Sequence, residues 1–170
     1  MANIGLIRVD PEKAADGAWF TFYDPGDGTE PIRVRVRRIN HGPYQAAVLR
    51  ALKPFRAEMM KTEEDGEEGW SPERRLAIVG PVVARHLVTD WSGIEEDVEE
   101  EVVDTTVANA EGTPPAPTIV RRSAPVPFSV EKCAEYLSDP SYRDFYDFVI
   151  MSSASREAFR LEQREVASGN

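Results

Sequence analysis

The fold is decided where residues 32–37 read Ile-Arg-Val-Arg-Val-Arg and the residues from Tyr44 onward read Tyr-Gln-Ala-Ala-Val-Leu-Arg-Ala-Leu. The first run alternates apolar and basic side chains, which places Ile32, Val34 and Val36 on one face of a strand. In the second run the apolar residues recur at three- and four-residue spacing, as they do on one face of a helix. This switch of period predicts an α+β fold in which helix dominates.

The segment before the alternating run completes a hairpin. Residues 18–23 read Ala-Trp-Phe-Thr-Phe-Tyr, which is typical of a strand, and residues 24–29 concentrate turn formers. An isolated hairpin is marginal in water, so its apolar face has to pack on something else. We therefore predict an N-terminal β-hairpin at roughly 17–38, packed on the helices that follow.

Four or five amphipathic helices are predicted after the hairpin. The first covers roughly residues 43–60, with a break or kink at Pro54. Ser71-Pro72-Glu73 begins the next, whose apolar stripe runs through Leu87 to Trp91 and bends at Gly80-Pro81. Ser129 and Asp139 are the predicted caps of the last helices, which carry an aromatic stripe.

A long insertion separates the two groups of helices. Residues 95–104 hold seven acidic side chains and no basic one, and residues 105–127 are rich in Pro, Thr and Ala. Such a segment has little apolar surface to bury, so we expect residues 95–124 to be a disordered, mobile insertion, with 119–122 as a possible short edge strand. The predicted organisation is one domain made of residues 1–94 and 125–170, interrupted by this insertion.

Composition excludes several classes of function. The 170 residues carry 20 basic and 30 acidic side chains, a net charge of −10, and residues 57–112 alone carry 4 and 16. This charge disfavours binding to nucleic acid or to an anionic membrane. No apolar run is long enough to span a membrane, and the N-terminus does not resemble a secretory signal. One cysteine and two histidines exclude an internal disulfide and the usual closed zinc site.

The sequence contains little that points to catalysis. We find no phosphate-binding glycine motif, no serine elbow and no paired histidines. The segment 24–28 resembles a calcium loop but lacks its third acid and distal glutamate, so a turn is the better interpretation. Cys133 is predicted to be a buried apolar residue, His86 a surface or half-buried residue and His41 a loop residue. We therefore predict no catalytic, cofactor-binding or metal-binding residue, and no enzyme.

Two charged runs have alternative interpretations. The arginines at 33, 35, 37 and 38 can form a plain solvated strand face, contact an acidic partner, or contact nucleic acid, in that order of preference. An acidic run such as 95–104 is usually a solubilising tether. Its alternative role is to mimic the charge of nucleic-acid phosphates, as inhibitors of DNA-binding proteins do.

Several pieces, taken in order, resemble the tail assembly chaperones of phages with long non-contractile tails. The first part of the chain contributes an opening, a first strand, a returning strand and a helix entry, at Val9-Asp10-Pro11, 17–20, 35–39 and Pro43-Tyr44. The later part contributes a helix ending in a tryptophan-glycine-aliphatic turn at 88–94, a proline-aromatic-serine entry at 125–129, and Leu137-Ser138-Asp139-Pro140 before the aromatic helix of 142–149. Where this chain has residues 95–124, similar proteins usually have a brief acidic turn.

The resemblance implies a non-enzymatic protein that acts in the cytoplasm of the infected host. It implies binding to the tape-measure protein, recruitment of tail-tube subunits and absence from the mature virion, with self-association as a further option and no nucleic-acid or membrane partner. The alternatives are a structural virion protein of the tail or head-tail region, and an acidic DNA-mimic inhibitor of a host enzyme. The predicted partner contacts are Arg33, Arg35, Arg37, Trp91, Phe128, Tyr142, Phe145 and Tyr146.

Overall fold

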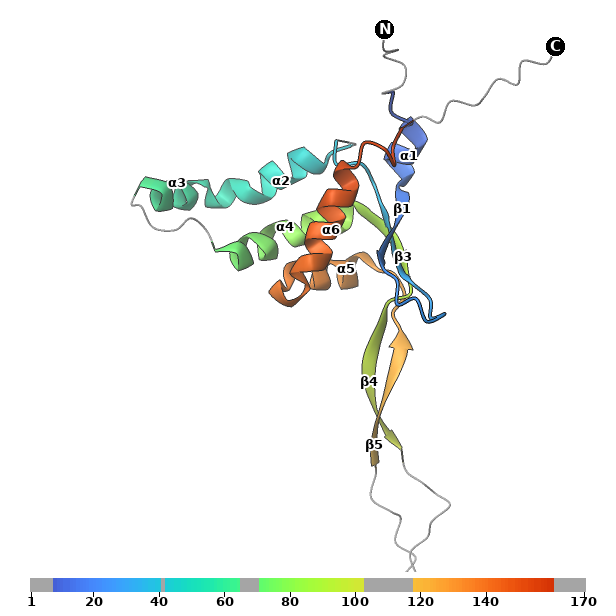
Figure 1. Ribbon diagram of the computed structural model, residues 1–170. Coiled ribbons are helices and arrows are strands. Elements are labelled where there is room, and N and C mark those ends of the chain that lie inside the picture. Colours follow the sequence, from blue (N-terminus) through green and yellow to red (C-terminus); the bar gives the residue numbers. More distant parts are fainter. Residues whose placement is uncertain (1–7, 41, 65–70, 103–117, 161–170) are drawn as a thin grey trace, which may run out of the picture. The chain divides into compact units, whose positions relative to one another are not determined.

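A computed structural model of the protein describes residues 8–40, 42–64, 71–102 and 118–160. The chain divides into two compact units (Figure 1). We call Met1–Ser92 together with Phe128–Asn170 the packed unit, and Gly93–Pro127 the ribbon unit. Each is described by itself.

The packed unit contains a three-stranded antiparallel sheet. Its strands are β1 (Ala18–Tyr23), β2 (Ile32–Val36) and β3 (Val88–Ser92), in the order β1-β2-β3. On the central strand, Val34 lies opposite Phe20 of β1 and opposite Trp91 of β3. Val34 and Val36 are completely buried, so the apolar face of the alternating run forms the centre of the core.

A short helix, α1 (Pro11–Asp16), precedes the sheet. The side chain of Asp10 caps it by accepting hydrogen bonds from the backbone N–H groups of Glu12 and Lys13, at 2.9 and 3.1 Å. Gly17 ends it with a φ of 92°, and a Cβ there would lie 3.1 Å from the carbonyl of Val36. Only glycine fits this turn between the helix and β1.

The described chain closes on itself beside α1. Val9 forms an isolated antiparallel bridge with Arg160, and the backbone N–H of Asp10 donates to the carbonyl oxygen of Phe159 at 2.9 Å. The ring of Phe159 is fully buried and packs on Phe20 of β1, with 6.1 Å between the ring centroids. Segments from the two ends of the sequence therefore share one piece of the core.

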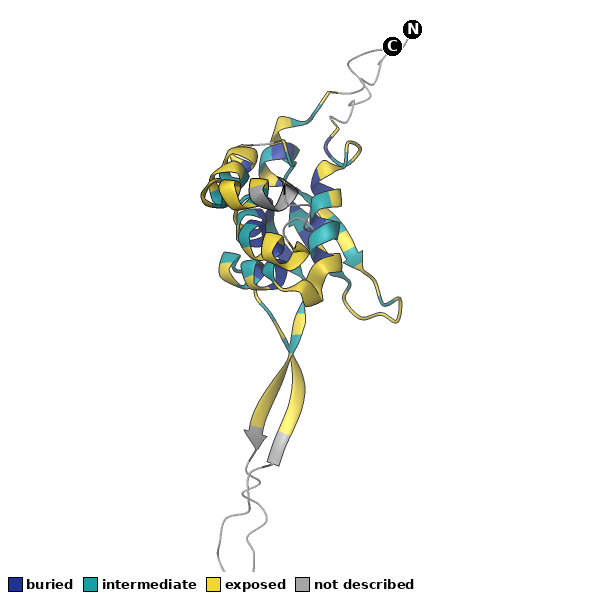
Figure 2. Cartoon of the chain, turned by 90° about the vertical axis from the view of Figure 1, so that its left-hand side faces the viewer, coloured by how far each residue is buried: buried dark blue, intermediate teal, exposed yellow. Residues whose placement is uncertain are grey.

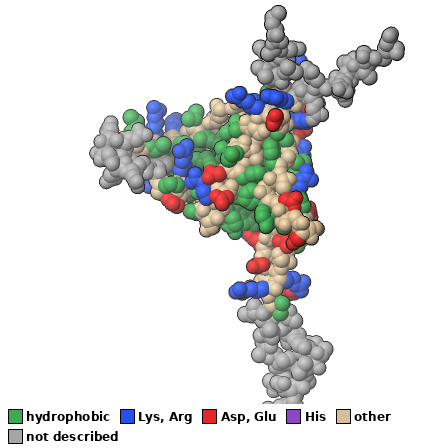
Figure 3. Space-filling view, in the orientation of Figure 1, with side chains coloured by type: hydrophobic (Ala, Val, Ile, Leu, Met, Phe, Trp, Pro, Cys, Tyr) green, Lys and Arg blue, Asp and Glu red, His purple; other side chains and the backbone are tan. Residues whose placement is uncertain are grey.

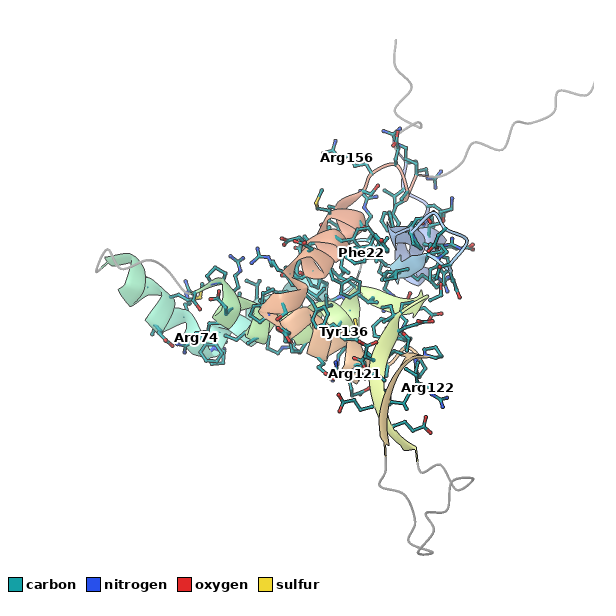
Figure 4. The ribbon with its side chains drawn as sticks, turned by 60° about the horizontal axis from the view of Figure 1, so that its bottom comes forward. Phe22, Arg74, Arg121, Arg122, Tyr136 and Arg156 are labelled. Atoms are coloured by element: carbon teal, nitrogen blue, oxygen red, sulfur yellow. The ribbon has the colours of Figure 1, made fainter. Side chains whose placement is uncertain are left out.

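The next helices form an arm and its support. The arm consists of α2 (Tyr44–Leu52), the 3-10 turn η2 (Lys53–Phe55) and α3 (Arg56–Glu64). Its helix α2 packs beside α4 (Pro72–His86). The predicted helical region at 43–60 is thus two helices with Pro54 inside the turn between them. Arg74 of α4 pairs with Glu58 of α3 at 2.6 Å and lies over the ring of Phe55 (Figure 4).

The last helices pack on α4 and on the sheet. They are α5 (Val130–Ser138), the 3-10 turn η3 (Pro140–Tyr142) and α6 (Arg143–Ala154). A Cβ at Gly80 of α4 would lie 2.5 Å from the carbonyl oxygen of Leu137, so glycine permits the close contact between α4 and α5. α4 runs through Gly80-Pro81 as one helix. Phe145 of α6 packs edge-on against Phe22 of β1, with ring centroids 5.3 Å apart.

The ribbon unit is a two-stranded antiparallel sheet of β4 (Glu95–Val102) and β5 (Thr118–Pro125). Ion pairs cross it from Arg121 to Glu99 at 2.9 Å and from Arg122 to Glu100 at 2.7 Å. Most of its described side chains are exposed (Figure 2).

The predicted fold, a hairpin followed by helices with a disordered insertion, is wrong. The structure has two antiparallel sheets, and residues 95–102 and 118–124 of the predicted insertion belong to paired strands. The prediction counted buried apolar surface alone, whereas ladder hydrogen bonds and cross-strand ion pairs stabilise this segment. Residues 103–117 lie outside the described residues.

The predicted hairpin only partly matches the sheet, because β3 adds a third strand. Residues 88–92 were predicted as the end of a helix, and the resemblance implied the same. The register between β2 and β3 shifts at Val36, so Val88 and Trp91 both face the core although they are three residues apart. Apolar residues three apart are also typical of one face of a helix, which explains the wrong prediction. Helix α1, before the hairpin, is also absent from the prediction.

Candidate partner-binding surface

Arg33 and Arg35 of β2, and Arg37 directly after this strand, make contacts within the protein. The Nε atom of Arg37 donates to the carbonyl oxygen of Ala15 at 2.7 Å, and that of Arg35 donates to the carbonyl oxygen of Gly17 at 3.4 Å. Arg33 is exposed and lies over the ring of Trp19, 5.6 Å from its centroid. Arg35 and Arg37 therefore fix the end of α1 against the sheet. Of the three arginines, Arg33 is the one exposed to a partner.

Trp91, Phe128 and Tyr142 belong to one chain of aromatic contacts. Trp91 packs edge-on against Phe128, with ring centroids 5.0 Å apart, and also contacts Tyr136 at 5.7 Å. Tyr136, which is labelled in Figure 4, contacts Tyr142, with 5.0 Å between the ring centroids. Trp91 is only 5% exposed, so its ring serves the core, whereas Tyr142 at the other end is 45% exposed.

Neighbouring residues of α6 point to different places. Phe145 is buried against Phe22, so it holds the helix on the sheet. Tyr146 is half-buried and lines a depression between α2, α4 and α6. Of the eight predicted contact residues, Tyr146 alone lies in a depression described below.

We call this depression the inner groove. It has a volume of about 420 Å³. Its walls are apolar and aromatic, with two arginines among them: Ile39, Tyr44, Val48, Pro72, Arg75, Leu76, Val79, Arg143, Tyr146 and Ile150. Among the described residues, no acidic side chain lines it.

The two tyrosines of the inner groove are held neutral. Burial raises the pKa of Tyr44 to about 12, the neighbouring Tyr146 adds to the rise, and Arg75 opposes it. Burial is also the main cause of the raised pKa of Tyr146. Arg143 pairs with Asp147 at 3.0 Å, so the groove offers phenol hydroxyls and the guanidinium of Arg75 beside apolar side chains, which suits a ligand that is part apolar and part acidic.

The arm carries a second and larger depression, the arm groove, with a volume of about 690 Å³. Three apolar and three basic side chains line it: Leu49, Leu52, Met59, Arg50, Lys53 and Arg56. Leu49 is 71% exposed, and Met60, next to the groove in sequence, is 53% exposed. Figure 3 shows hydrophobic and basic side chains close together over α2 and α3.

A third depression, the α6 groove, lies between β1 and the opposite side of α6. It has a volume of about 470 Å³. Phe20, Phe148 and Met151 form its apolar part, and Asp144 and Asp147 are its charged residues. The packed unit thus has apolar depressions with basic rims on the arm side and one with an acidic rim on α6.

The described residues show no metal-binding cluster. They contain no group of three or more His, Cys, Asp or Glu side chains placed to hold a metal ion. Cys133 is fully buried, and burial raises the pKa of its thiol to about 12, which makes it a poor nucleophile. Burial, followed by the charges of Arg85, Arg37 and Arg50, lowers the pKa of His86. In the parts of the chain that the structure describes, no helix is both long and apolar enough to cross a membrane.

The arm groove is absent from the sequence prediction, although a signal for it exists. Tyr44 and Val48 of the helical stripe line the inner groove, but Leu49 lies off that stripe, as does Met60 on α3. Apolar residues outside the core stripe, with Arg50, Lys53 and Arg56 between them, indicate a second face.

No model of a known protein family, no curated protein sequence and no solved structure matches this chain.

Proposed function

We propose that this protein is a non-enzymatic tail assembly chaperone of a phage, which binds the tape-measure protein and recruits tail-tube subunits to it. The ordered sequence resemblance supports the proposal. Its structural support is the arm, which presents apolar side chains to solvent on an otherwise well-packed unit. The proposed place of action is the host cytoplasm, and the protein is expected to leave before the virion is complete.

The exposure of Leu49 is the observation that carries the proposal. A leucine that is 71% exposed forgoes most of the stabilisation available from burial, which is about 25 cal/mol per Å² of apolar surface. Leu52 and Met59 continue the same surface within the arm groove. Contiguous exposed apolar surface with a polar rim is typical of a protein-binding site.

The same surface suggests how a chaperone of this kind would work. A long helical protein such as a tape-measure protein exposes apolar stripes that aggregate, and an amphipathic helix is recognised by a groove that accepts residues at positions i, i+3, i+4 and i+7. Docking on the arm would cover the apolar surfaces of both molecules. The charged rim and the net charge of −10 would keep the complex soluble.

The ribbon argues against the DNA-mimic alternative. In β4, Glu99 and Glu100 pair with Arg121 and Arg122 of β5, so part of the negative charge is neutralised within the ribbon. A mimic of nucleic-acid phosphates needs that charge presented outward. A structural virion protein is distinguished by experiment, because it would be abundant in purified particles.

Co-expression with the tape-measure protein of the same phage tests the proposal. We expect the tape-measure protein to move from the insoluble to the soluble fraction and to be retained with this chain in a pull-down. Leu49→Glu should reduce retention, because it places a charge on the arm surface. Met151→Glu is the matched control, since Met151 is 74% exposed but belongs to the α6 groove.

Two results would overturn the proposal. One is a tape-measure protein that stays insoluble and binds neither variant nor parent. The other is recovery of this chain from purified particles in amounts comparable to those of the tube protein, which would favour a structural role.

A further inference from the structure

The cations of the arm groove are not used within the described protein. Arg50, Lys53 and Arg56 lie three residues apart in sequence, so they follow one side of the arm, and no ion pair joins them to an acidic side chain in the described residues. Arg74, in contrast, pairs with Glu58 on the other side of α3. Among the described residues, α4 thus supplies a partner on one side of the arm, whereas the cations on the other side have no acidic partner.

We infer that the arm groove selects an acidic amphipathic helix of the partner, one with apolar residues on one face and Asp or Glu beside them. This inference rests on the proposed function as a helix-binding protein and specifies the chemistry of the segment that is bound. Leu49, Leu52 and Met59 would receive the apolar residues, and the three cations would receive the carboxylates.

The charge of the whole chain does not oppose this preference. Salt screens charges beyond about 8 Å at physiological ionic strength, so a bound helix responds to the groove and much less to the net charge of the chain. Among the described residues, no acidic side chain lines the arm groove. A basic helix would place its positive charges against those of Arg50, Lys53 and Arg56 and would remove water from them. Repulsion of this kind excludes wrong partners.

Two labelled synthetic helices serve as probes. Both carry leucine at positions i, i+3, i+4 and i+7, and they differ only in the flanking residues, which are Glu in one and Lys in the other. Binding to the full chain is measured by fluorescence anisotropy at low and high salt. We expect the Glu helix to bind at least about tenfold more tightly than the Lys helix, and added salt to reduce the difference.

Charge reversal locates the site. The variant Arg50→Glu/Lys53→Glu/Arg56→Glu should weaken binding of the Glu helix by at least about tenfold and remove its advantage over the Lys helix. The control Arg8→Glu/Arg156→Glu/Arg160→Glu makes the same change of net charge at three exposed arginines outside the groove, and should leave binding unchanged. Circular dichroism and thermal melting verify that both variants fold like the parent.

The inference is overturned if the Lys helix binds as tightly as the Glu helix, or if the groove variant binds the Glu helix like the parent. It is also overturned if a second copy is the occupant. In that case sedimentation would show oligomers that are lost both in the groove variant and in Asp144→Lys/Asp147→Lys, which reverses the acidic rim of the α6 groove.

Failure of the proposed function gives a different pattern. If the Glu helix binds as expected but the tape-measure protein is not retained, the charge preference stands and the chaperone role fails. If the groove variant retains the tape-measure protein like the parent, the chaperone role stands and the charge preference fails.

Discussion

The sheet of the packed unit and the ribbon contain the same kind of backbone pairing but are stabilised by different interactions. In the sheet, Val34 and Val36 are completely buried and Trp91 lies beside them. In the ribbon, Val98 and Val120 are 45% and 43% exposed, and Arg121 and Arg122 pair with glutamates. Burial therefore stabilises the first sheet, whereas hydrogen bonds and screened ion pairs stabilise the second.

The largest expected effect concerns the packed sheet. Trp91→Ala removes a buried ring that contacts Phe128 and Tyr136, and should lower the free energy of unfolding by about 3–5 kcal/mol in a denaturant titration. Trp19→Ala is the control, because Trp19 is 42% exposed and loses less buried surface than Trp91, together with a contact with Arg33 that is worth about 0.5–1 kcal/mol. Equal losses for the two variants would contradict the assignment of Trp91 to the core.

Thiol labelling compares the accessibility of the two regions directly. Cys133 is fully buried, so reagent can reach it only when the packed unit opens. A cysteine introduced by Val98→Cys, with Cys133→Ala in the same chain, should react at least about a hundredfold faster than Cys133 does in the parent. Similar rates would mean that the packed unit does not protect Cys133 from the reagent.

A smaller effect is expected where α4 meets α5. Gly80→Ala places a methyl group 2.5 Å from the carbonyl oxygen of Leu137, and overpacking of this kind costs about 1–3 kcal/mol. The gain in helix propensity, about 1 kcal/mol, offsets part of this cost. Ala77→Ser, at an exposed position of the same helix, is the control. Increased stability of Gly80→Ala would show that the two helices can separate without loss.

The smallest effect is expected in the ribbon. Arg121→Glu places two like charges across the strands at Glu99, which should destabilise the ribbon by about 0.2–1 kcal/mol. Hydrogen exchange of the amides in β4 and β5 should accelerate, while the melting temperature of the packed unit stays unchanged. The exchanged pair Glu99→Arg/Arg121→Glu should restore the parent rates. Faster exchange throughout the packed unit would mean that the two units unfold together.

The regions also differ in what sequence reasoning could find. The alternation of Val34 and Val36 with arginines predicts β2, and Ser71-Pro72-Glu73 predicts the start of α4, because both signals are local. Asp10-Pro11-Glu12 carries the same cap, proline and acid, so α1 was predictable in the same way. The ribbon depends on partners about twenty residues apart, as in Glu99 and Arg121, and no local pattern reveals such a pairing.

The candidate surface was less predictable than the fold. Charge and alternation alone cannot show that Arg35 and Arg37 bind the carbonyl groups of Gly17 and Ala15, because this requires α1 to be in place. The arm groove depends on which side of α2 faces α4, and that is decided by tertiary packing. Exposed apolar residues outside a helical stripe, such as Leu49, are the signal that the sequence does contain.

The bridge between Val9 and Arg160 makes the described backbone of the packed unit nearly circular. A short linker could therefore join the two bridged segments without drawing them across the core. New chain ends could then be opened in the exposed turn at 24–30. There the side chain of Asp24 accepts a hydrogen bond from the backbone N–H of Gly26, which is a contact within the turn itself. In such a circular permutant β1 and β2 would no longer be consecutive in the chain, yet each would keep its place in the sheet. Their pairing would then depend on the core they share, because no turn would connect them.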